Sequence, residues 1–99
     1  RQPIAPLPTG DLSGRTVDTS GALLPGVHVY AHSDRGSVST ITDKQGRFAF
    51  RALPVGSYTL WANLQGFEAT SSRATVEAGA VTPVGLTLKV RKAMKAVQR

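Results

Sequence analysis

The chain is 99 residues long, 40% hydrophobic and 18% charged, a size and composition that indicate one folded domain and exclude an intrinsically disordered chain. It contains no cysteine, which excludes disulfides, thiolate metal sites and a thiol nucleophile. Its net charge is +6, but five of the 12 bases lie in the last eleven residues, whereas the first 88 residues hold seven bases and six acids. The sequence therefore predicts a near-neutral body with a basic tail rather than a nucleic-acid-binding domain.

The N-terminal stretch 1–10 carries prolines at positions 3, 6 and 8. Because proline fixes φ and has no N–H to donate, we predict that this stretch is an extended arm. The chain begins with Arg1 rather than methionine, which we interpret as processing or as excision from a longer protein, and both suit an exported protein. No apolar run reaches the roughly 18 residues of a membrane-spanning helix.

Short runs in which apolar and polar residues alternate follow the arm, separated by turn-forming glycine, proline and aspartate. Seven short strands at about ten-residue spacing are typical of an antiparallel β-sandwich. We therefore expect a single all-β sandwich over residues 11–90. The predicted strands span residues 11–17, 27–33, 37–43, 47–53, 57–64, 67–77 and 81–90.

The segment DKQG at 43–46 lies between two predicted strands and raises the question of a chemical site. Aspartate accepts hydrogen bonds from backbone amides two residues on, and glycine supplies a positive φ, so Asp43 and Gly46 are predicted to form a tight turn. Pro54 and Gly56 are predicted to form the next corner. We interpret these residues as structural rather than catalytic.

Three stretches carry a resemblance: SGRTVDTSGALLPGVHVYA at 13–31, TDKQGRFAFRALPVGSYTLWA at 42–62 and QGF at 65–67. They are similar in order and spacing to the carboxypeptidase regulatory-like domain family, whose fold is a transthyretin-like (Ig-like) sandwich. The resemblance covers residues 11–90. It implies an accessory module of the kind attached to peptidases, outer-membrane receptors and secreted or surface proteins, generally without catalysis.

The residue types that usually act in catalysis or bind metals are poorly placed for these roles. His28 and His32 share one face of a predicted strand with their Cα atoms about 13 Å apart, so one metal ion cannot take both. The sequence lacks an H-x-x-E zinc pattern and a G-x-S-x-G elbow, and it ends in KAVQR where the transthyretin-like purine hydrolase has Tyr-Arg-Gly-Ser. Arg15 occupies the first strand, where isopeptide-forming sandwiches need a lysine. We predict no catalytic residue, no metal ligand and no cofactor.

Trp61 is the strongest candidate for a binding residue. The alternation in 57–64 places it on the face opposite Tyr58, so if Tyr58 is in the core, Trp61 points outward. His28 and Tyr30 are expected beside it, because the second and fifth strands are neighbours in transthyretin-like folds. Three alternatives remain open for Trp61: cover by the chain's own arm or tail, cover by a protein partner, or stacking against a sugar.

The C-terminal stretch 91–99 has the pattern of a short basic helix that is ordered only against a partner, since isolated helices need about 12–15 residues. It is a solvated end or linker, a docking segment for an acidic protein, or a contact for an anionic membrane surface or nucleic acid. Nucleic acid is the least favoured, because the neutral body has no basic stripe with interleaved aromatics. The bases predicted to contact a partner are Lys89, Arg91, Lys92, Lys95 and Arg99.

Together these features predict a non-catalytic structural or protein-interaction module. We expect it to be an accessory domain or small subunit of an exported or envelope assembly outside the cytoplasm, whose partners are other subunits or domains. The alternative is a carbohydrate-binding module that uses Trp61 and Tyr30.

Overall fold

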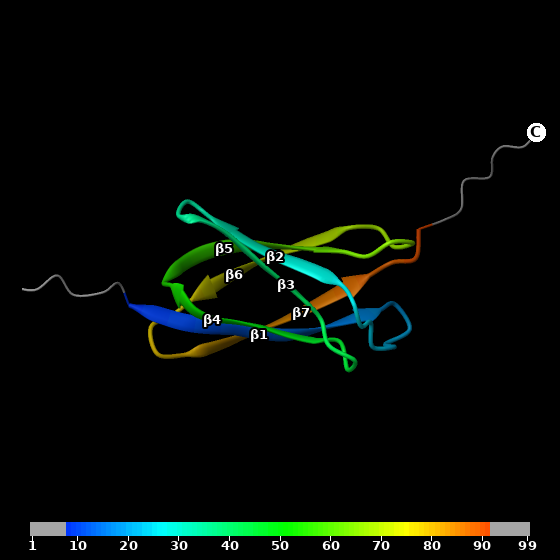
Figure 1. Ribbon diagram of the computed structural model, residues 1–99, viewed down its shortest axis with the longest axis horizontal. Helices are drawn as coiled ribbons and strands as arrows, with labels where there is room; N and C mark the ends of the chain where they lie inside the picture. The colour runs from blue at the N-terminus through cyan, green and yellow to red at the C-terminus, as the bar shows by residue number, and fades with distance from the viewer. Residues whose placement is uncertain (1–7, 92–99) are drawn as a thin grey trace, which may run out of the picture.

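The computed structural model describes residues 8–91, which form seven strands and no helix, so this part of the chain has no helix able to span a membrane (Figure 1). The predicted seven-stranded sandwich is confirmed. The strands are β1 (Thr9–Asp18), β2 (His28–Ser33), β3 (Gly36–Ile41), β4 (Arg47–Pro54), β5 (Gly56–Asn63), β6 (Thr70–Val76) and β7 (Val81–Leu88).

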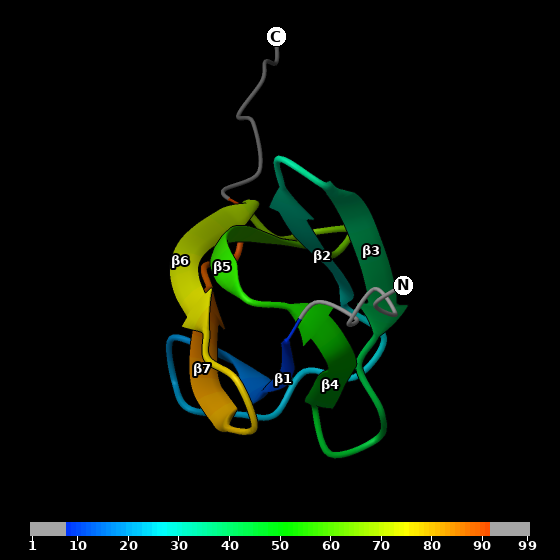
Figure 2. The same cartoon turned by 90° about the vertical axis from the view of Figure 1, so that its left-hand side faces the viewer.

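Two sheets form the layers of the sandwich. One has three strands in the order β4-β1-β7, and the other has four in the order β3-β2-β5-β6. Seen from the end of the sandwich, the two sheets lie face to face (Figure 2), and the buried hydrophobic residues lie between them. Each sheet therefore has an outer face that is free for other contacts.

Several strand boundaries differ from the sequence-based expectation, most of them by one or two residues, and two starts show the reason. β1 begins at Thr9 rather than at residue 11, because Thr9 and Gly10 pair with the end of β4. β6 begins at Thr70 rather than at residue 67, because a turn precedes it in which the N–H of Phe67 donates to the carbonyl of Leu64 at 3.0 Å. Both differences depend on partners that alternation along the chain does not reveal.

One pairing departs from the predicted antiparallel arrangement. β1 and β7 run parallel from the pair Asp11–Val81 to the pair Asp18–Leu88, whereas the other four pairings are antiparallel. β1 and β7 are the first and last strands, so no short hairpin links them and forces opposite directions. The sequence pattern gave no indication of this pair.

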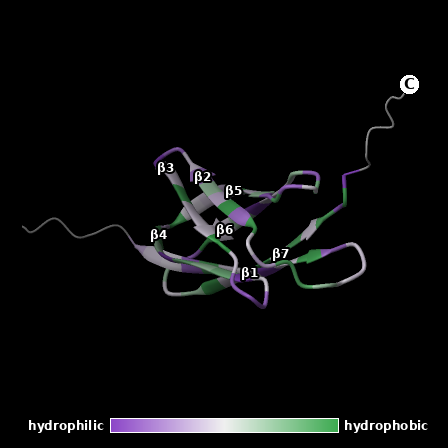
Figure 3. Ribbon diagram, turned by 45° about the vertical axis from the view of Figure 1, so that its right-hand side comes forward, coloured by the Kyte–Doolittle hydropathy of each residue, from purple (hydrophilic) through white to green (hydrophobic). Residues whose placement is uncertain are grey.

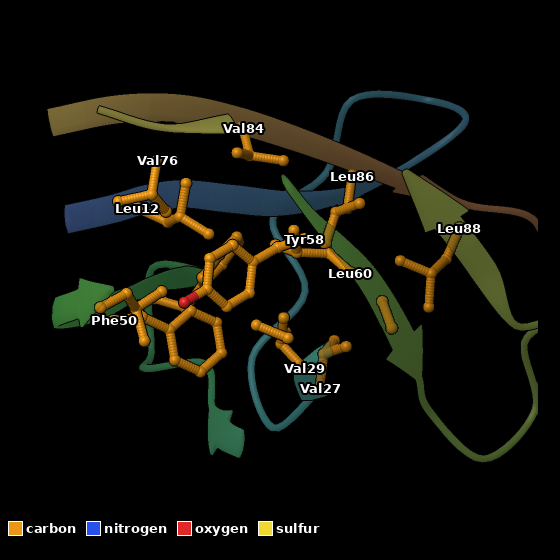
Figure 4. Packing of buried hydrophobic residues seen from close by; sticks show 14 of the residues in the cluster. Leu12, Val27, Val29, Phe50, Tyr58, Leu60, Val76, Val84, Leu86 and Leu88 are labelled. Atoms are coloured by element: carbon orange, nitrogen blue, oxygen red, sulfur yellow. The ribbon is translucent and has the colours of Figure 1, made fainter. Parts of the chain in front are cut away.

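Inward-facing side chains of both sheets form one core between the layers, and apolar and polar residues alternate along the strands (Figures 3 and 4). Phe48 and Phe50 pack edge to face with ring centroids 6.0 Å apart. Buried Tyr58 keeps its hydroxyl satisfied by donating to the carbonyl of Pro54 at 2.7 Å. The core consists of Leu12, Leu24, Val27, Val29, Ala31, Phe48, Phe50, Leu53, Tyr58, Leu60, Ala62, Val76, Val84, Leu86 and Leu88.

Two buried threonines fasten the loop between β1 and β2 to the sandwich. The hydroxyl of Thr16 donates to the carbonyl of Leu24 at 2.8 Å, and the hydroxyl of Thr42 donates to the same oxygen at 2.9 Å. Thr42 also accepts the N–H of Val27 at 2.9 Å. The loop that leads into β2 is thereby held by bonds from β1 and from the end of β3, which sets the start of β2.

The parallel pair depends on a close approach at Gly14. A Cβ at this position would overlap the carbonyl oxygen of Val84 and lie 3.0 Å from the ring of Phe48. At Gly85, its neighbour on the outer side of β7, a Cβ would meet nothing within 4 Å.

We predict that Gly14→Ala lowers the free energy of unfolding by at least about 1–3 kcal/mol, because the methyl group forces β1 and β7 apart. Gly85→Ala is the matched control and should change stability by no more than about 0.5 kcal/mol. Urea denaturation of both variants measures this. Equal effects would contradict the close β1–β7 approach.

Candidate binding face

The outer face of the four-stranded sheet carries an aromatic row that crosses all four strands. Tyr30 on β2 lies directly opposite Trp61 on β5. Ser39 of β3 is paired with Tyr30, and Ser71 of β6 is paired with Trp61. Trp61 is 49% exposed and Tyr30 is 40% exposed. Because a serine stands on each side, the two rings form the raised centre of this face.

A mainly polar row lies on each side of the aromatic row. The hydroxyl of Ser37 lies 2.7 Å from Nδ1 of His32, so that imidazole is already engaged on the sheet. Imidazole, amide and hydroxyl groups thus surround an apolar centre, an arrangement that suits a binding surface. One row is Ile41, His28 and Asn63, and the other is Ser37, His32, Thr59 and Arg73.

Tyr30 and Trp61 are exposed because inward-facing and outward-facing side chains alternate along β2 and β5. Val29 and Ala31 from β2, and Leu60 and Ala62 from β5, have no exposed surface. Successive side chains in a strand point to opposite faces, so filling the core with these residues turns Tyr30 and Trp61 outward. The exposure of Trp61 therefore agrees with the alternation of the sequence, whereas the pairing of Trp61 with Tyr30 depends on strand register.

The predicted basic residues divide into two groups. Lys89 and Arg91 are exposed and lie outside the three rows. The carbonyl of Lys89 accepts the N–H of Glu68 at 2.8 Å, and the N–H of Arg91 donates to the carbonyl of Gly66 at 2.9 Å, so this segment is anchored on the turn before β6. The remaining predicted contacts, Lys92, Lys95 and Arg99, lie outside the described residues. The structure thus brings Trp61, Tyr30 and His28 together and leaves Lys89 and Arg91 apart from them.

The Asp43 segment is a turn. Oδ1 of Asp43 accepts the N–H groups of Gln45 and Arg47, each at 2.9 Å. Gly46 has a φ of 74°, and its N–H donates to the carbonyl of Asp43 at 2.9 Å. Its backbone also packs against β1, since a Cβ there would lie 2.7 Å from the carbonyl oxygen of Thr16. The Asp43 carboxylate is therefore engaged with backbone N–H groups of the turn, as expected of a structural residue.

The same turn occurs earlier in the chain, at Asp18, Ser20 and Gly21, whose residue types are typical of turns. Oδ1 of Asp18 accepts the N–H groups of Ser20 at 2.8 Å and Ala22 at 3.0 Å, and Gly21 has a φ of 90°. The signal was present, because both turns have aspartate followed three residues later by glycine. The hydroxyl of Ser20 donates to Asp18 and lowers the pKa of that carboxyl. The hydrogen bond from the N–H of Arg47 lowers the pKa of the Asp43 carboxyl. The guanidinium of Arg47, whose Nε lies 3.5 Å from Oδ2 of Asp43, lowers this pKa further.

At the predicted corner, Pro54 accepts the hydroxyl of Tyr58, and Gly56 has a φ of 139°. The N–H of Val55, which lies between them, donates to the carbonyl of Pro8 at 3.1 Å. Both predicted corner residues therefore shape the link between β4 and β5.

A hollow lies elsewhere, on the outer face of the three-stranded sheet. It is shallow, measures about 730 Å³ and is lined in part by Gly14, Arg15, Arg47 and Gly85. Gly85 lies on the outer side of β7 and contributes no side chain to this hollow. Its one carboxylate, Asp43, is already engaged in the turn. We therefore attribute this hollow to strand packing and favour the aromatic row as the binding face.

The model of the carboxypeptidase regulatory-like domain family matches residues 11–89. The chain belongs to this family. The resemblance found in the sequence is thus confirmed, and the two aspartate turns and the paired strands β2 and β5 all lie within the matched residues. No curated protein matches the chain.

Solved structures share the fold at low sequence identity. A minor pilin of Streptococcus agalactiae is 20% identical with a TM-score of 0.73, over 94% of this chain and 49% of the pilin. A candidate carbohydrate-binding protein of Pseudomonas aeruginosa is 17% identical with a TM-score of 0.65, over 82% and 89%. A catechol 1,2-dioxygenase of Acinetobacter radioresistens is 11% identical with a TM-score of 0.70, over 94% and 56%. The chain thus spans about half the length of the pilin and the dioxygenase.

We predict that the turn acids contribute stability that acid removes. A lowered folded-state pKa means that the contribution of Asp43 is complete above the ordinary aspartate value of about 3.9 and is lost as pH falls through the folded-state value. The stability difference between the wild type and Asp43→Asn should therefore shrink below that pH. Denaturation between neutral pH and acid measures it. Lys44→Gln changes the charge of the same turn and should keep the wild-type acid dependence, and a difference for Asp43→Asn that is constant with pH would contradict the account.

Proposed function

We propose that this domain is a non-catalytic protein-binding module of an exported or cell-envelope assembly, in which a neighbouring subunit covers Trp61 and Tyr30. The observation that supports it is the direct pairing of two half-exposed aromatic residues on neighbouring strands at the centre of a sheet face. Tryptophan and tyrosine are enriched among residues that dominate binding energy, since they combine a large apolar surface with a polar group.

A non-catalytic role is supported by how the titratable groups are used. Asp18 and Asp43 accept backbone bonds in turns, and residues 8–91 contain no group of three histidines or acids able to hold a metal ion. The likeness to a dioxygenase is 11% in identity and concerns the fold. Membership of a family of accessory domains supports the same proposal.

An extracytoplasmic assembly is supported by the likeness to a minor pilin, which shares the fold over 94% of this chain. The basic tail extends the proposal. Lys89 and Arg91 lie at the end of β7, and three further bases follow in the sequence. Such a segment suits an acidic surface on the partner.

Carbohydrate binding is the second candidate, and the aromatic row favours it specifically. A flat ring beside hydroxyl and amide groups can stack on a sugar and bond its hydroxyls, and Trp61 has Ser71 and Tyr30 on its two sides. A candidate carbohydrate-binding protein shares the fold. In this case the tail takes no part.

We predict that Trp61→Ala weakens retention of the native partner by about 2 kcal/mol, or roughly 30-fold, while stability changes by less than about 1 kcal/mol. The matched control is Val81→Ala, which truncates a 61% exposed side chain on the outer face of the other sheet. The measurement is quantitative co-purification of each variant from the native envelope fraction. Equal retention of the two variants would contradict the proposed face.

We predict further that salt weakens the assembly, because exposed charges are screened. Removal of residues 92–99 should reproduce much of this loss, since it takes away three bases and keeps the backbone bonds of Lys89 and Arg91. Affinity electrophoresis on envelope polysaccharides separates the alternatives. A glycan module would lose retardation with Trp61→Ala and keep it without the tail.

A further inference from the structure

The sandwich has four edge strands, and three of them carry features that discourage pairing with another chain. β4 has Arg47, Arg51 and Pro54, and β7 has Pro83, which lacks an N–H. β6 has Arg73 and lies against β7, where the hydroxyl of Thr82 donates to the carbonyl of Thr75 at 2.9 Å. Charges and prolines at edges are the usual protection against unwanted strand addition.

β3 carries none of these features. Its sequence, GSVSTI, has no charge and no proline, and its side chains are exposed apart from partly covered Thr40. Within residues 8–91 it pairs only with β2. Val38 is 42% exposed and Ile41 is 56% exposed, so apolar surface is available along this edge. An uncharged, β-prone edge is a template for another strand.

The backbone of β3 shows which groups are free. The N–H of Thr42 donates to the carbonyl of Val27 at 3.0 Å, just beyond β3. The backbone N–H and C=O groups that face β2 therefore recur at every second residue of β3, at Thr40 and Val38. In an antiparallel ladder the residues between them point the other way. The N–H and C=O groups of Ser37, Ser39 and Ile41 therefore face the open edge.

We propose that a second copy of this chain occupies that edge, with the two β3 strands antiparallel about a twofold axis at Ser39. This register places Ser39 opposite the partner's Ser39, and Ser37 opposite the partner's Ile41. Each such pair exchanges two backbone bonds, so all the free groups of both strands are used in about six bonds. The register shifted by two residues leaves some of them unpaired.

Charge favours a second copy as the occupant. A twofold axis brings identical residues together, so a charged residue at the axis would repel its own copy. The β3 strand has no charge at the axis. Continuing the register beyond the strand brings the turn Asp34–Arg35 of one copy towards the partner's segment Asp43–Lys44, with acid facing base and base facing acid. Opposite charges across a strand pair are favourable.

The dimer would also extend the aromatic row. Ser39 lies in the row with Tyr30 and Trp61, so pairing at Ser39 joins the rows of both copies into one surface on an eight-stranded sheet. This inference goes beyond the proposed function. It is tested on the isolated chain, so it can fail while partner binding at Trp61 holds, and the reverse.

The first test introduces a like charge at the axis. The wild type should form a dimer in sedimentation equilibrium as its concentration rises from micromolar to millimolar. Ser39→Lys should raise the dissociation constant by at least about tenfold, because two lysines then face each other. The matched control is Ser71→Lys, a serine of the same row on the other edge strand, which should dimerise like the wild type. A monomer at every concentration, an open polymer, or equal effects of both lysines would overturn the proposal.

The second test measures the formation of a covalent link between two copies instead of the loss of dimerisation. Because the chain has no cysteine, Ser39→Cys provides a single thiol that a short bis-maleimide can link only between two copies. The proposed pair has Cα atoms about 5.5 Å apart, so covalent dimers should form rapidly at concentrations where the wild type is dimeric. Ser71→Cys should link at the slow rate of random collision. Equal rates would overturn the proposal.

Discussion

The register between β2 and β5 is the constraint on which the binding face depends. Val29 and Ala62 are fully buried and lie opposite each other, so the two strands have one register that fills the core. A slip of one residue would turn the apolar side chains to water and bring Tyr30 and Trp61 inside. The hydrophobic effect on the inner face therefore fixes the position of both rings on the outer face.

The outer faces of the two sheets serve different purposes in this account. On the three-stranded sheet, Gly14 permits close β1–β7 packing, and Asp43 holds the turn beside it. Asp11 and Asp43 accept backbone N–H groups there, and Arg47 lies beside Asp43. On the four-stranded sheet, Tyr30 and Trp61 are paired residues of β2 and β5 whose side chains are about half exposed. We therefore assign binding to the outer face of the four-stranded sheet.

Much of this could be predicted from the sequence, because local patterns determine it. Alternation located the strands and the outward direction of Trp61, and the spacing of aspartate and glycine located the turn at Asp43. The same spacing occurs at Asp18 and Gly21. Features that depend on long-range partners could not be predicted this way: the parallel β1–β7 pair, the start of β1 at Thr9, and the alignment of Ser39 with the aromatic row all require knowledge of which strands are neighbours.

The most direct test of the binding face is the solvent accessibility of its rings in the native assembly. Hydroxyl-radical oxidation followed by mass spectrometry reports modification of Trp61, the only tryptophan of the chain, and of Tyr30. We predict rapid oxidation of both rings in the isolated chain and strong protection in the native envelope fraction, with Val81 on the other sheet oxidised equally in both. Oxidation of Trp61 at the same rate in the isolated chain and in the assembly would contradict the account.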